Sequence, residues 1–436
     1  MNNQTPLKLH NTYLGLCLLA TFSITQVQAT SLQEAYQLAV NSDPLLQQSA
    51  SRLLNSQENI HQAKAALLPT VNGTLQADWQ DASNAEQSNS KAYGITLSQP
   101  VYSPALTSAY KKVKTLQQQS EISHRQSEQN LILRTSQSYL NAMLAQSKLT
   151  TSQAQERALK QRLDTINVQY DVGIIAITDV HEAKASYDNA KVDLIISEGA
   201  LQNSLEALQR LTGTIITDIN SLSDKYQAKT LEPNQADHWV AQAKANNLEV
   251  LFGKIAIESA GYDTRIASAS RMPSVNLAAS HSRTKHSLNG TYSNNKITLA
   301  LSVPLFNGGS LSSQVRQAIS NQNIAKAQQQ DNIRAVTQLT RSSVRDIQTN
   351  VLAISARKQS ITSSAAALDA ISAGFDAGTR NIVDLLQAEQ ALFSAKNEYA
   401  SARLNHIKLH LNLKYQLGTL SGKDITELNN LLIPAK

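Results

Sequence analysis

Two long stretches of the chain contain neither glycine nor proline, the residues that most often interrupt a helix. Residues 105–172 form the first stretch, and residues 310–373 form the second. As a continuous helix, the first stretch would be about 100 Å long, since each residue adds about 1.5 Å. Helical patterns of this length are typical of coiled coils. Only 15 Gly and 9 Pro occur in 436 residues, which excludes an all-β fold with a turn about every ten residues.

The two stretches belong to an internal repeat, in which segments recur at a spacing of about 204 residues. The paired segments are 67–72 with 271–276, 97–102 with 301–306, 170–173 with 375–378, and Gly213 with Gly418. Two copies therefore cover residues 30–213 and 236–422, joined by a link of residues 214–235 and followed by a tail of residues 423–436. Each copy is predicted to contain a helix, two strands, a very long helix, a turn marked by glycine and a final helix.

The shorter helices are predicted over residues 31–68 and 179–213 in the first copy and over 236–272 and 384–418 in the second. One long helix is expected to pack against two stacked short helices in each copy. In the second copy, apolar and small residues follow the heptad spacing of a coiled-coil seam. They are Val344, Ile347, Val351, Ile354 and Ile361, then Leu385, Ala388, Leu392, Ala395, Tyr399, Ala402, Leu409 and Leu413, with His406 as the polar exception. Within residues 117–130, only Ile122 is a candidate core residue.

Between the helices, four segments alternate apolar and polar residues with a period of two, which indicates strands. The segments contain Val71, Tyr93, Val275 and Ile297, and each has about nine or ten residues. A tilted strand of this length crosses a bilayer, with one face toward lipid and the other toward water. Residues 81–91 and 283–294, which are rich in Ser and Asn, are predicted to be surface loops. Alternation alone would also fit ordinary half-buried strands in the sheet of a soluble protein, which is the alternative interpretation of these segments.

Four strands beside helices of this length have no other core to cover them, and open sheet edges do not occur in lipid. Four strands are also too few to close a barrel with a hollow interior. Several chains must therefore contribute, and three chains would supply twelve strands above a matching ring of helices. The predicted fold class is α with transmembrane β, a homotrimeric 12-stranded β-barrel continuous with a long α-helical coiled-coil barrel.

The N-terminus is typical of a secretory signal peptide, predicted over residues 1–29. Lys8 and His10 precede a short apolar core, and the small side chain of Ala29 suits a cleavage site. The only cysteine, Cys17, lies in this segment and follows a bulky leucine, so lipidation is not expected. The mature chain would then have no disulfides and no cysteine metal ligands. The net charge of +6 comes from scattered Lys and Arg, which does not indicate a nucleic-acid partner.

Two segments at the predicted turns resemble the inter-helix turns of the TolC family of outer-membrane efflux and type I secretion channels. They are residues 170–180 (YDVGIIAITDV) and 378–386 (GTRNIVDLL), and residues 413–420 (LKYQLGTL) are similar to the family's closing segment. The resemblance covers essentially the whole mature chain, in order. It implies a homotrimer in the outer membrane of a Gram-negative bacterium. A long periplasmic tunnel of helices is also implied, with an equatorial collar formed by the link and the C-terminal tail.

The resemblance also implies site residues near the turns. Thr178, Asp179 and Arg380 match positions at which the family closes the periplasmic tip of the tunnel by hydrogen bonds and salt bridges. An ion pair between Arg380 and Asp179 would break when the coiled coils untwist to open the entrance. Asp384 matches a position that forms a ring of acidic side chains at the constriction, and such a ring attracts cations.

Two positions depart from the family pattern. Phe375 replaces a tyrosine, so the hydroxyl bond to Asp179 cannot form. Gln387 replaces a second acidic residue, one turn beyond Asp384. The closed tip is therefore expected to be held by fewer hydrogen bonds and to carry one carboxylate ring instead of two.

No catalytic or nucleotide-binding pattern of the GxxxxGK[ST], HExxH or GxSxG type occurs. Neither an enzyme nor a cofactor is expected, and His406 and His410 have no third metal ligand nearby in sequence.

The expected function is a passive exit duct for efflux of small toxic compounds, type I protein secretion or both. The energy would come from an inner-membrane RND or ABC-type transporter, through a periplasmic adaptor that contacts the turns at Gly173 and Gly378. A structural coiled-coil outer-membrane anchor or adhesin without channel activity is the alternative.

Overall fold

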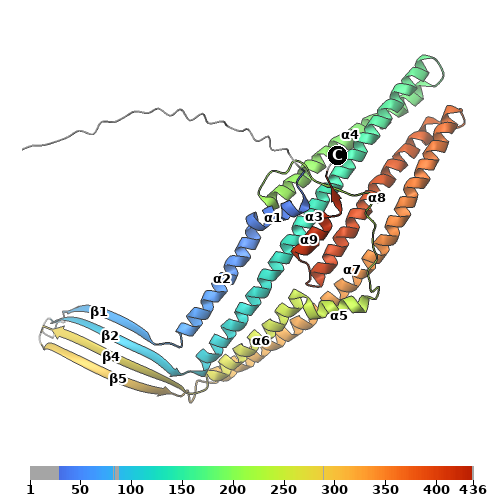
Figure 1. Ribbon diagram of the computed structural model, residues 1–436. Helices are drawn as coiled ribbons and strands as arrows, with labels where there is room; N and C mark the ends of the chain where they lie inside the picture. Colours follow the sequence, from blue (N-terminus) through green and yellow to red (C-terminus); the bar gives the residue numbers. More distant parts are fainter. Residues whose placement is uncertain (1–28, 82, 84–87, 288, 435–436) are drawn as a thin grey trace, which may run out of the picture.

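The computed structural model describes residues 29–81, 83, 88–287 and 289–434. The predicted signal peptide therefore lies outside the described residues, except for Ala29. The described chain is elongated, with a four-stranded sheet at one end and two helical hairpins that extend to the other end (Figure 1). We refer to the end formed by the two hairpin turns as the tip.

The first copy of the repeat is built around one long helix, α3 (Pro104–Asp171), which has 68 residues. Near the sheet α3 packs against α2 (Pro44–Ala65), and toward the tip it packs against α4 (Ile177–Thr212) (Figure 1). A further short helix, α1 (Leu32–Ser42), contacts both α3 and α4. The predicted arrangement of one long helix against two stacked shorter helices is confirmed for this copy.

The second copy repeats this arrangement around α7 (Ser310–Asp376), which has 67 residues and continues through Gly374. Its partners are α6 (Leu248–Ala269) near the sheet and α8 (Ile382–Gln416) toward the tip, while α5 (Ala236–Asn246) packs across α7. The residues of the predicted heptad seam are buried or half-buried, as expected.

The helices predicted as continuous over residues 31–68 and 236–272 are each broken once, so these two predictions are wrong. At the first break, the backbone of Asp43 is extended and its Oδ1 accepts a hydrogen bond from the Leu46 N–H at 2.8 Å. Pro44 follows at the first helical position, where no backbone N–H is needed. At the second break, Asn247 Oδ1 accepts from the Val250 N–H at 3.1 Å. A capping side chain therefore starts a new helix at each break.

The repeated glycines explain how the helix ends stack at these breaks. Gly213 follows α4 and Gly418 follows α8, with φ values of +71° and +69°. A Cβ added at Gly213 would lie 3.1 Å from Cβ of Ser42, and one added at Gly418 would lie 2.3 Å from the backbone oxygen of Asn246. The ends of α1 and α5 can approach this closely only because these positions lack a side chain.

The variant Gly418→Ala is expected to lower the free energy of unfolding by about 3 kcal/mol. The positive φ accounts for about 1 kcal/mol, and the clash with rigid backbone adds roughly 2 kcal/mol. Gly378→Ala is the matched control, because Gly378 has a φ of +73° but no atom within 4 Å of an added Cβ. Denaturant unfolding should show a loss of only about 1 kcal/mol for this control. Equal losses in the two variants would contradict the close approach at Gly418.

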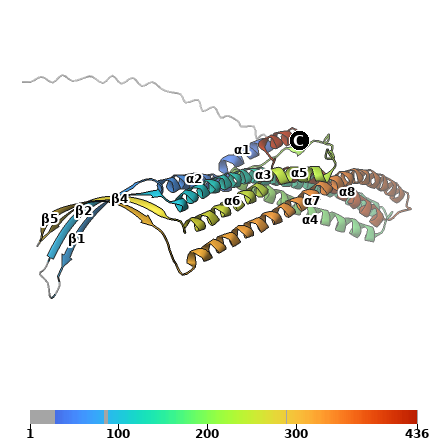
Figure 2. The same cartoon turned by 90° about the horizontal axis from the view of Figure 1, so that it is seen from below.

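The sheet consists of β1 (Thr70–Gln80), β2 (Ser88–Tyr102), β4 (Ser274–His286) and β5 (Gly290–Ser302). The strands are antiparallel in the order β1-β2-β4-β5, so β1 and β5 form open edges. Figure 2 shows that the sheet is curved and extends beyond the helices. The strands have 11 to 15 residues and are longer than predicted. Parts of the predicted loops 81–91 and 283–294 belong to strands, because backbone pairing continues where the side chains are polar.

The register gathers the apolar side chains on one face of the sheet. Val71 lies opposite Leu97, Leu97 opposite Ala279, and Ala279 opposite Ile297. The apolar members of this face are Val71, Leu75, Trp79, Tyr93, Ile95, Leu97, Val275, Leu277, Ala279, Ile297, Leu299 and Leu301. The other face is mostly Ser, Thr, Asn and Gln. We refer to these as the apolar face and the polar face.

None of the described helices combines the length and the apolarity needed to cross a membrane.

The link and the tail meet about halfway along α3. There β3 (Ser221–Leu222) pairs with β6 (Leu432–Ile433), and α9 (Gly422–Asn429) packs against α1. The hydroxyl of Tyr139, a fully buried residue of α3, donates a hydrogen bond to the Thr30 carbonyl at 2.8 Å. The largest hydrophobic core of the described residues surrounds this region.

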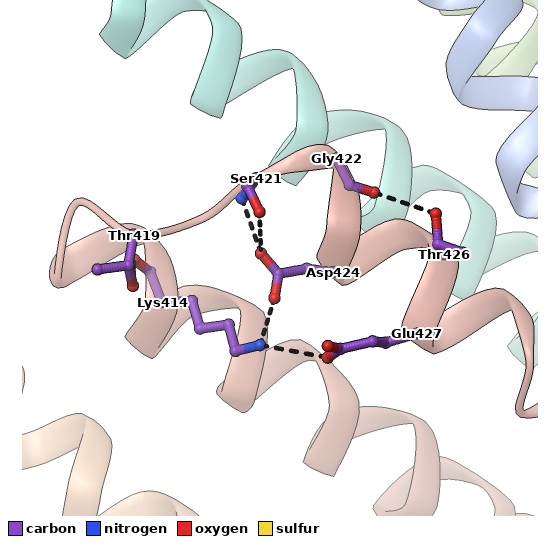
Figure 3. A network of polar contacts seen from close by, with 7 residues as sticks. All are labelled: Lys414, Thr419, Ser421, Gly422, Asp424, Thr426 and Glu427. Atoms are coloured by element: carbon purple, nitrogen blue, oxygen red, sulfur yellow. Dashed lines mark hydrogen bonds and ion pairs between the residues drawn. The ribbon is translucent and has the colours of Figure 1, made fainter.

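A polar network attaches α9 to α8 (Figure 3). Ser421 and Asp424 form a capping box at the start of α9, in which the carboxylate accepts a hydrogen bond from the Ser421 N–H at 2.7 Å. Lys414 of α8 pairs with Asp424, and its Nζ lies 3.6 Å from Glu427 Oε2. The start of α9 is therefore fixed both by its own cap and by a cation from the neighbouring helix.

Candidate functional site

The two turns at the tip have the same backbone construction. After α3, the N–H of Gly173 donates to the Tyr170 carbonyl at 2.8 Å, and the next residue donates to the Gln169 carbonyl at 2.9 Å. After α7, Gly378 donates to the Phe375 carbonyl at 3.0 Å, and the next residue donates to the Gly374 carbonyl at 2.8 Å. Both patterns are Schellman motifs, which need a residue with positive φ. Gly173 and Gly378 provide the positive φ, and both are exposed at the tip.

The predicted gate residues lie in the first turns of the helices that follow. Thr178 and Asp179 belong to the first turn of α4, and Asp384 belongs to the first turn of α8. A carboxylate in the first turn interacts favourably with the helix dipole. Gln387 lies three residues beyond Asp384, on the same face of α8, and is exposed. The side chain of Asn381, which the sequence analysis did not single out, caps α8 through a 2.8 Å bond from the Asp384 N–H.

Arg380 pairs with a different carboxylate from the one predicted. Its Nη1 lies 3.6 Å from Oδ2 of Asp384, whereas no ion pair joins Arg380 to Asp179 among the described residues of the single chain. The Arg380–Asp384 pair is partly exposed, so it contributes at most about 1 kcal/mol. The Arg380–Asp179 ion pair at the closed tip therefore stays a prediction.

A small hydrophobic core holds the tip together. Its buried members come from α3, α4 and α8 and are Leu159, Ile166, Ala183, Ala190, Ile382, Leu385 and Leu386. Phe375 of α7 is half-buried against this core. Its ring therefore contributes apolar contact at a position where the family pattern has a phenolic hydroxyl.

A largely buried ion pair near the tip, between Arg162 and Glu389, was not predicted from the sequence. Arg162 of α3 approaches Oε1 of Glu389 of α8 through Nη2 at 3.0 Å and Nε at 3.3 Å. The Glu389 side chain is only 8% exposed and that of Arg162 is 22% exposed. Burial raises the pKa of Glu389, although Arg162 opposes this effect, and Oε2 has no partner. This pair links the first hairpin to the second.

His406 and His410 do not form a metal centre in the described chain. The Nδ1 of His406 lies 2.5 Å from the Tyr226 hydroxyl, and its Nε2 lies 3.1 Å from the Lys229 carbonyl. Burial lowers the pKa of both histidines, that of His410 to about 4. The described residues contain no group of three or more potential metal ligands. Both ring nitrogens of His406 are thus used in packing the link against α8.

These features together define a class of protein. A curved antiparallel sheet presents one apolar and one polar face, and helical hairpins extend from it to a tip with polar and acidic side chains. This is the architecture of a subunit of an outer-membrane channel with a long tunnel of helices.

Comparison with known proteins agrees with this class. The family model "Outer membrane efflux protein" matches residues 35–214 and 239–419, and the chain belongs to this family. It is 32% identical over 441 residues to the outer membrane protein TolC of Escherichia coli K12, covering 96% of this chain and 88% of that protein. It is 27% identical over 414 residues to the alkaline protease secretion protein AprF of Pseudomonas aeruginosa, covering 91% of this chain and 86% of that protein.

Solved structures show the same fold. The crystal structure of the Campylobacter jejuni CmeC outer membrane channel superposes with a TM-score of 0.79 at 16% identity, covering 98% of each chain. The protein has the fold of the trimeric helical-barrel channels of this family, which confirms the predicted fold class. It is an exit duct located in the outer membrane, as predicted.

Proposed function

We propose that three copies of the chain close into one pipe, through which small toxic compounds and secreted proteins leave the cell. The observation that carries this proposal is the sheet, which has two unpaired edges and one apolar face. In lipid, unpaired backbone groups are too costly, so β1 of one copy must pair with β5 of the next. Three sheets of four strands each give twelve strands, with the polar face toward a water-filled lumen.

The tip is the proposed gate. The tip core and the Arg162–Glu389 pair hold the two hairpins together in the described chain. Opening would require α7 and α8 to move away from α3 and α4, so these contacts would have to break. Thr178 and Asp179 lie at the start of α4, Phe375 lies at the end of α7, and Arg380 lies in the turn between α7 and α8.

The proposed partners are a periplasmic adaptor and an inner-membrane transporter of the RND or ABC type. The exposed turns at Gly173 and Gly378 lie at the end opposite the sheet, where an adaptor arriving from the inner membrane would make contact. The family's name contains efflux, and the name of the relative AprF contains protease secretion, so we propose both uses for this chain.

Planar-bilayer recording combined with gene deletion tests the proposed duct. The purified protein should produce discrete conductance steps, and deletion of its gene should sensitise cells to dyes and detergents. A structural anchor or adhesin would produce neither effect, so failure of both would favour the alternative.

The selectivity constriction gives a separate prediction. A trivalent cation should block the channel from the tip side, because three Asp384 carboxylates would lie near the axis. Asp384→Ala should abolish most of this block. Gln387→Ala should change the block little, because the Gln387 side chain, one turn away, carries no charge. Single-channel recording measures both variants, and a larger loss of block in Gln387→Ala would contradict the assignment.

A further inference from the structure

Three cations are gathered on the apolar face of the sheet near its hairpin end. Lys91 of β2 lies directly opposite Lys285 of β4, and Arg283 lies two residues from Lys285 on the same face. All three side chains are exposed, and none forms an ion pair with a described acidic residue. Like charges directly opposite each other destabilise a sheet. A bound anion would offset this repulsion.

On β2 and β4, the cations lie where the apolar side chains of this face end. On β4, the side chains on this face run Val275, Leu277, Ala279 and then change to His281, Arg283 and Lys285 toward the hairpin. On β2, Leu97, Ile95 and Tyr93 precede Lys91 in the same direction. In a membrane, this boundary is the level at which hydrocarbon gives way to lipid headgroups.

The cations also border a hollow. A depression of about 720 Å³ is lined by Leu75, Tyr93, Lys91, Arg283, Lys285 and Thr291. It therefore offers apolar surface on the side of the membrane core and three positive charges on the side of the headgroups. Arg283 can bind a phosphate through two parallel N–H groups, and the lysines add point charges.

We infer that Lys91, Arg283 and Lys285 form a binding site for the phosphate groups of an outer-leaflet glycolipid. The inference rests on the proposed orientation of the sheet, in which the hairpin ends face the cell exterior because the helices extend into the periplasm. All three residues lie on the inner strands β2 and β4, so each chain carries a complete site. One lipid would lie against each chain, with its acyl chains along Leu75 and Tyr93.

Native mass spectrometry of the detergent-solubilised protein tests the site. The probes are a bisphosphorylated glucosamine-disaccharide lipid, the same lipid with its phosphates removed, and inorganic phosphate as competitor. The protein should retain one phosphorylated lipid per chain, and the dephosphorylated lipid should bind at least tenfold more weakly. Equal binding of the two lipids would overturn the inference, and displacement by an equal concentration of inorganic phosphate would assign the site to free phosphate instead.

A triple variant provides a second test of the same site. Lys91→Gln with Arg283→Gln and Lys285→Gln should weaken binding of the phosphorylated lipid at least tenfold. Lys296→Gln is the matched control, because this exposed lysine lies on the polar face of β5. Unchanged binding in the triple variant would overturn the inference. The oligomer mass and the conductance are recorded for every variant. Loss of lipid binding with unchanged mass and conductance concerns the lipid site alone, whereas loss of the oligomer or of conductance concerns the proposed channel.

Discussion

Arg162→Ala is expected to open the tip and to raise the single-channel conductance several-fold. The substitution leaves Glu389 as an unpaired carboxylate in a site where it is only 8% exposed. Loss of one partner from a buried pair costs about 3 kcal/mol in each chain. The cost is relieved when α8 moves away from α3 and water reaches the carboxylate. Planar-bilayer recording at neutral pH measures the effect.

Acid should reverse this opening. Burial already raises the pKa of Glu389, and removal of the Arg162 charge raises it further. As the pH falls through this raised pKa, the carboxyl group becomes neutral and no longer opposes burial. The extra conductance of Arg162→Ala should therefore decline as the pH is lowered from neutral toward the ordinary pKa of a glutamate. Conductance independent of pH would contradict this explanation.

Two further variants isolate the contribution of the buried pair. Arg357→Ala removes an ion pair with Glu398 between α7 and α8, and these side chains are 40% and 57% exposed. Such an exposed pair contributes at most about 1 kcal/mol, so the control should conduct like the parent. Arg162→Leu combined with Glu389→Leu should stay closed, because an apolar pair can replace a buried ion pair without loss. Equal single-channel conductance of Arg162→Ala and Arg357→Ala would contradict a role of the buried pair in closing the tip.

Leu299→Arg is expected to prevent assembly of the protein in the membrane. Leu299 lies in the middle of the apolar residues of β5, between Ile297 and Leu301, and is exposed in the single chain. Arginine on the lipid face near the midplane of a transmembrane strand costs about 2–4 kcal/mol, and this cost would recur in every copy. The amount of folded protein recovered from the outer-membrane fraction measures the effect.

The adjacent residue provides the control. Ala300 belongs to the same strand but to the polar face, opposite Asn276. Ala300→Arg adds the same side chain one position away, and it should be tolerated because it points into the water-filled lumen. Equal recovery of the two variants would contradict the assignment of the two faces.

Much of the fold follows from local patterns in the sequence. The absence of Gly and Pro predicts α3 and α7, and alternation predicts the four strands and their apolar face. The breaks at Asp43 and Asn247 were missed although an aspartate followed by Pro44 is a sequence signal for the start of a helix. At Asn247 the cap hydrogen bond identifies the break. The strand ends were also missed, because the added residues carry polar side chains and only the backbone pairing identifies them.

The site was predicted less completely than the fold. The residues around Gly173 and Gly378 are recognisable because two local motifs recur at a fixed spacing. The Arg162–Glu389 pair joins residues 227 positions apart, and neither lies in a repeated motif. Gln129 was not a candidate core residue, but it is buried and its Nε2 donates to the Gly418 carbonyl at 2.8 Å. Such contacts depend on how the two copies pack together, which local patterns do not specify.

Native mass spectrometry in a mild detergent tests most directly whether the chain closes into a pipe. We expect a complex with three times the mass of the mature chain, because a single sheet leaves the edges of β1 and β5 unpaired. A stable particle with the mass of one chain would contradict closure into a trimeric pipe.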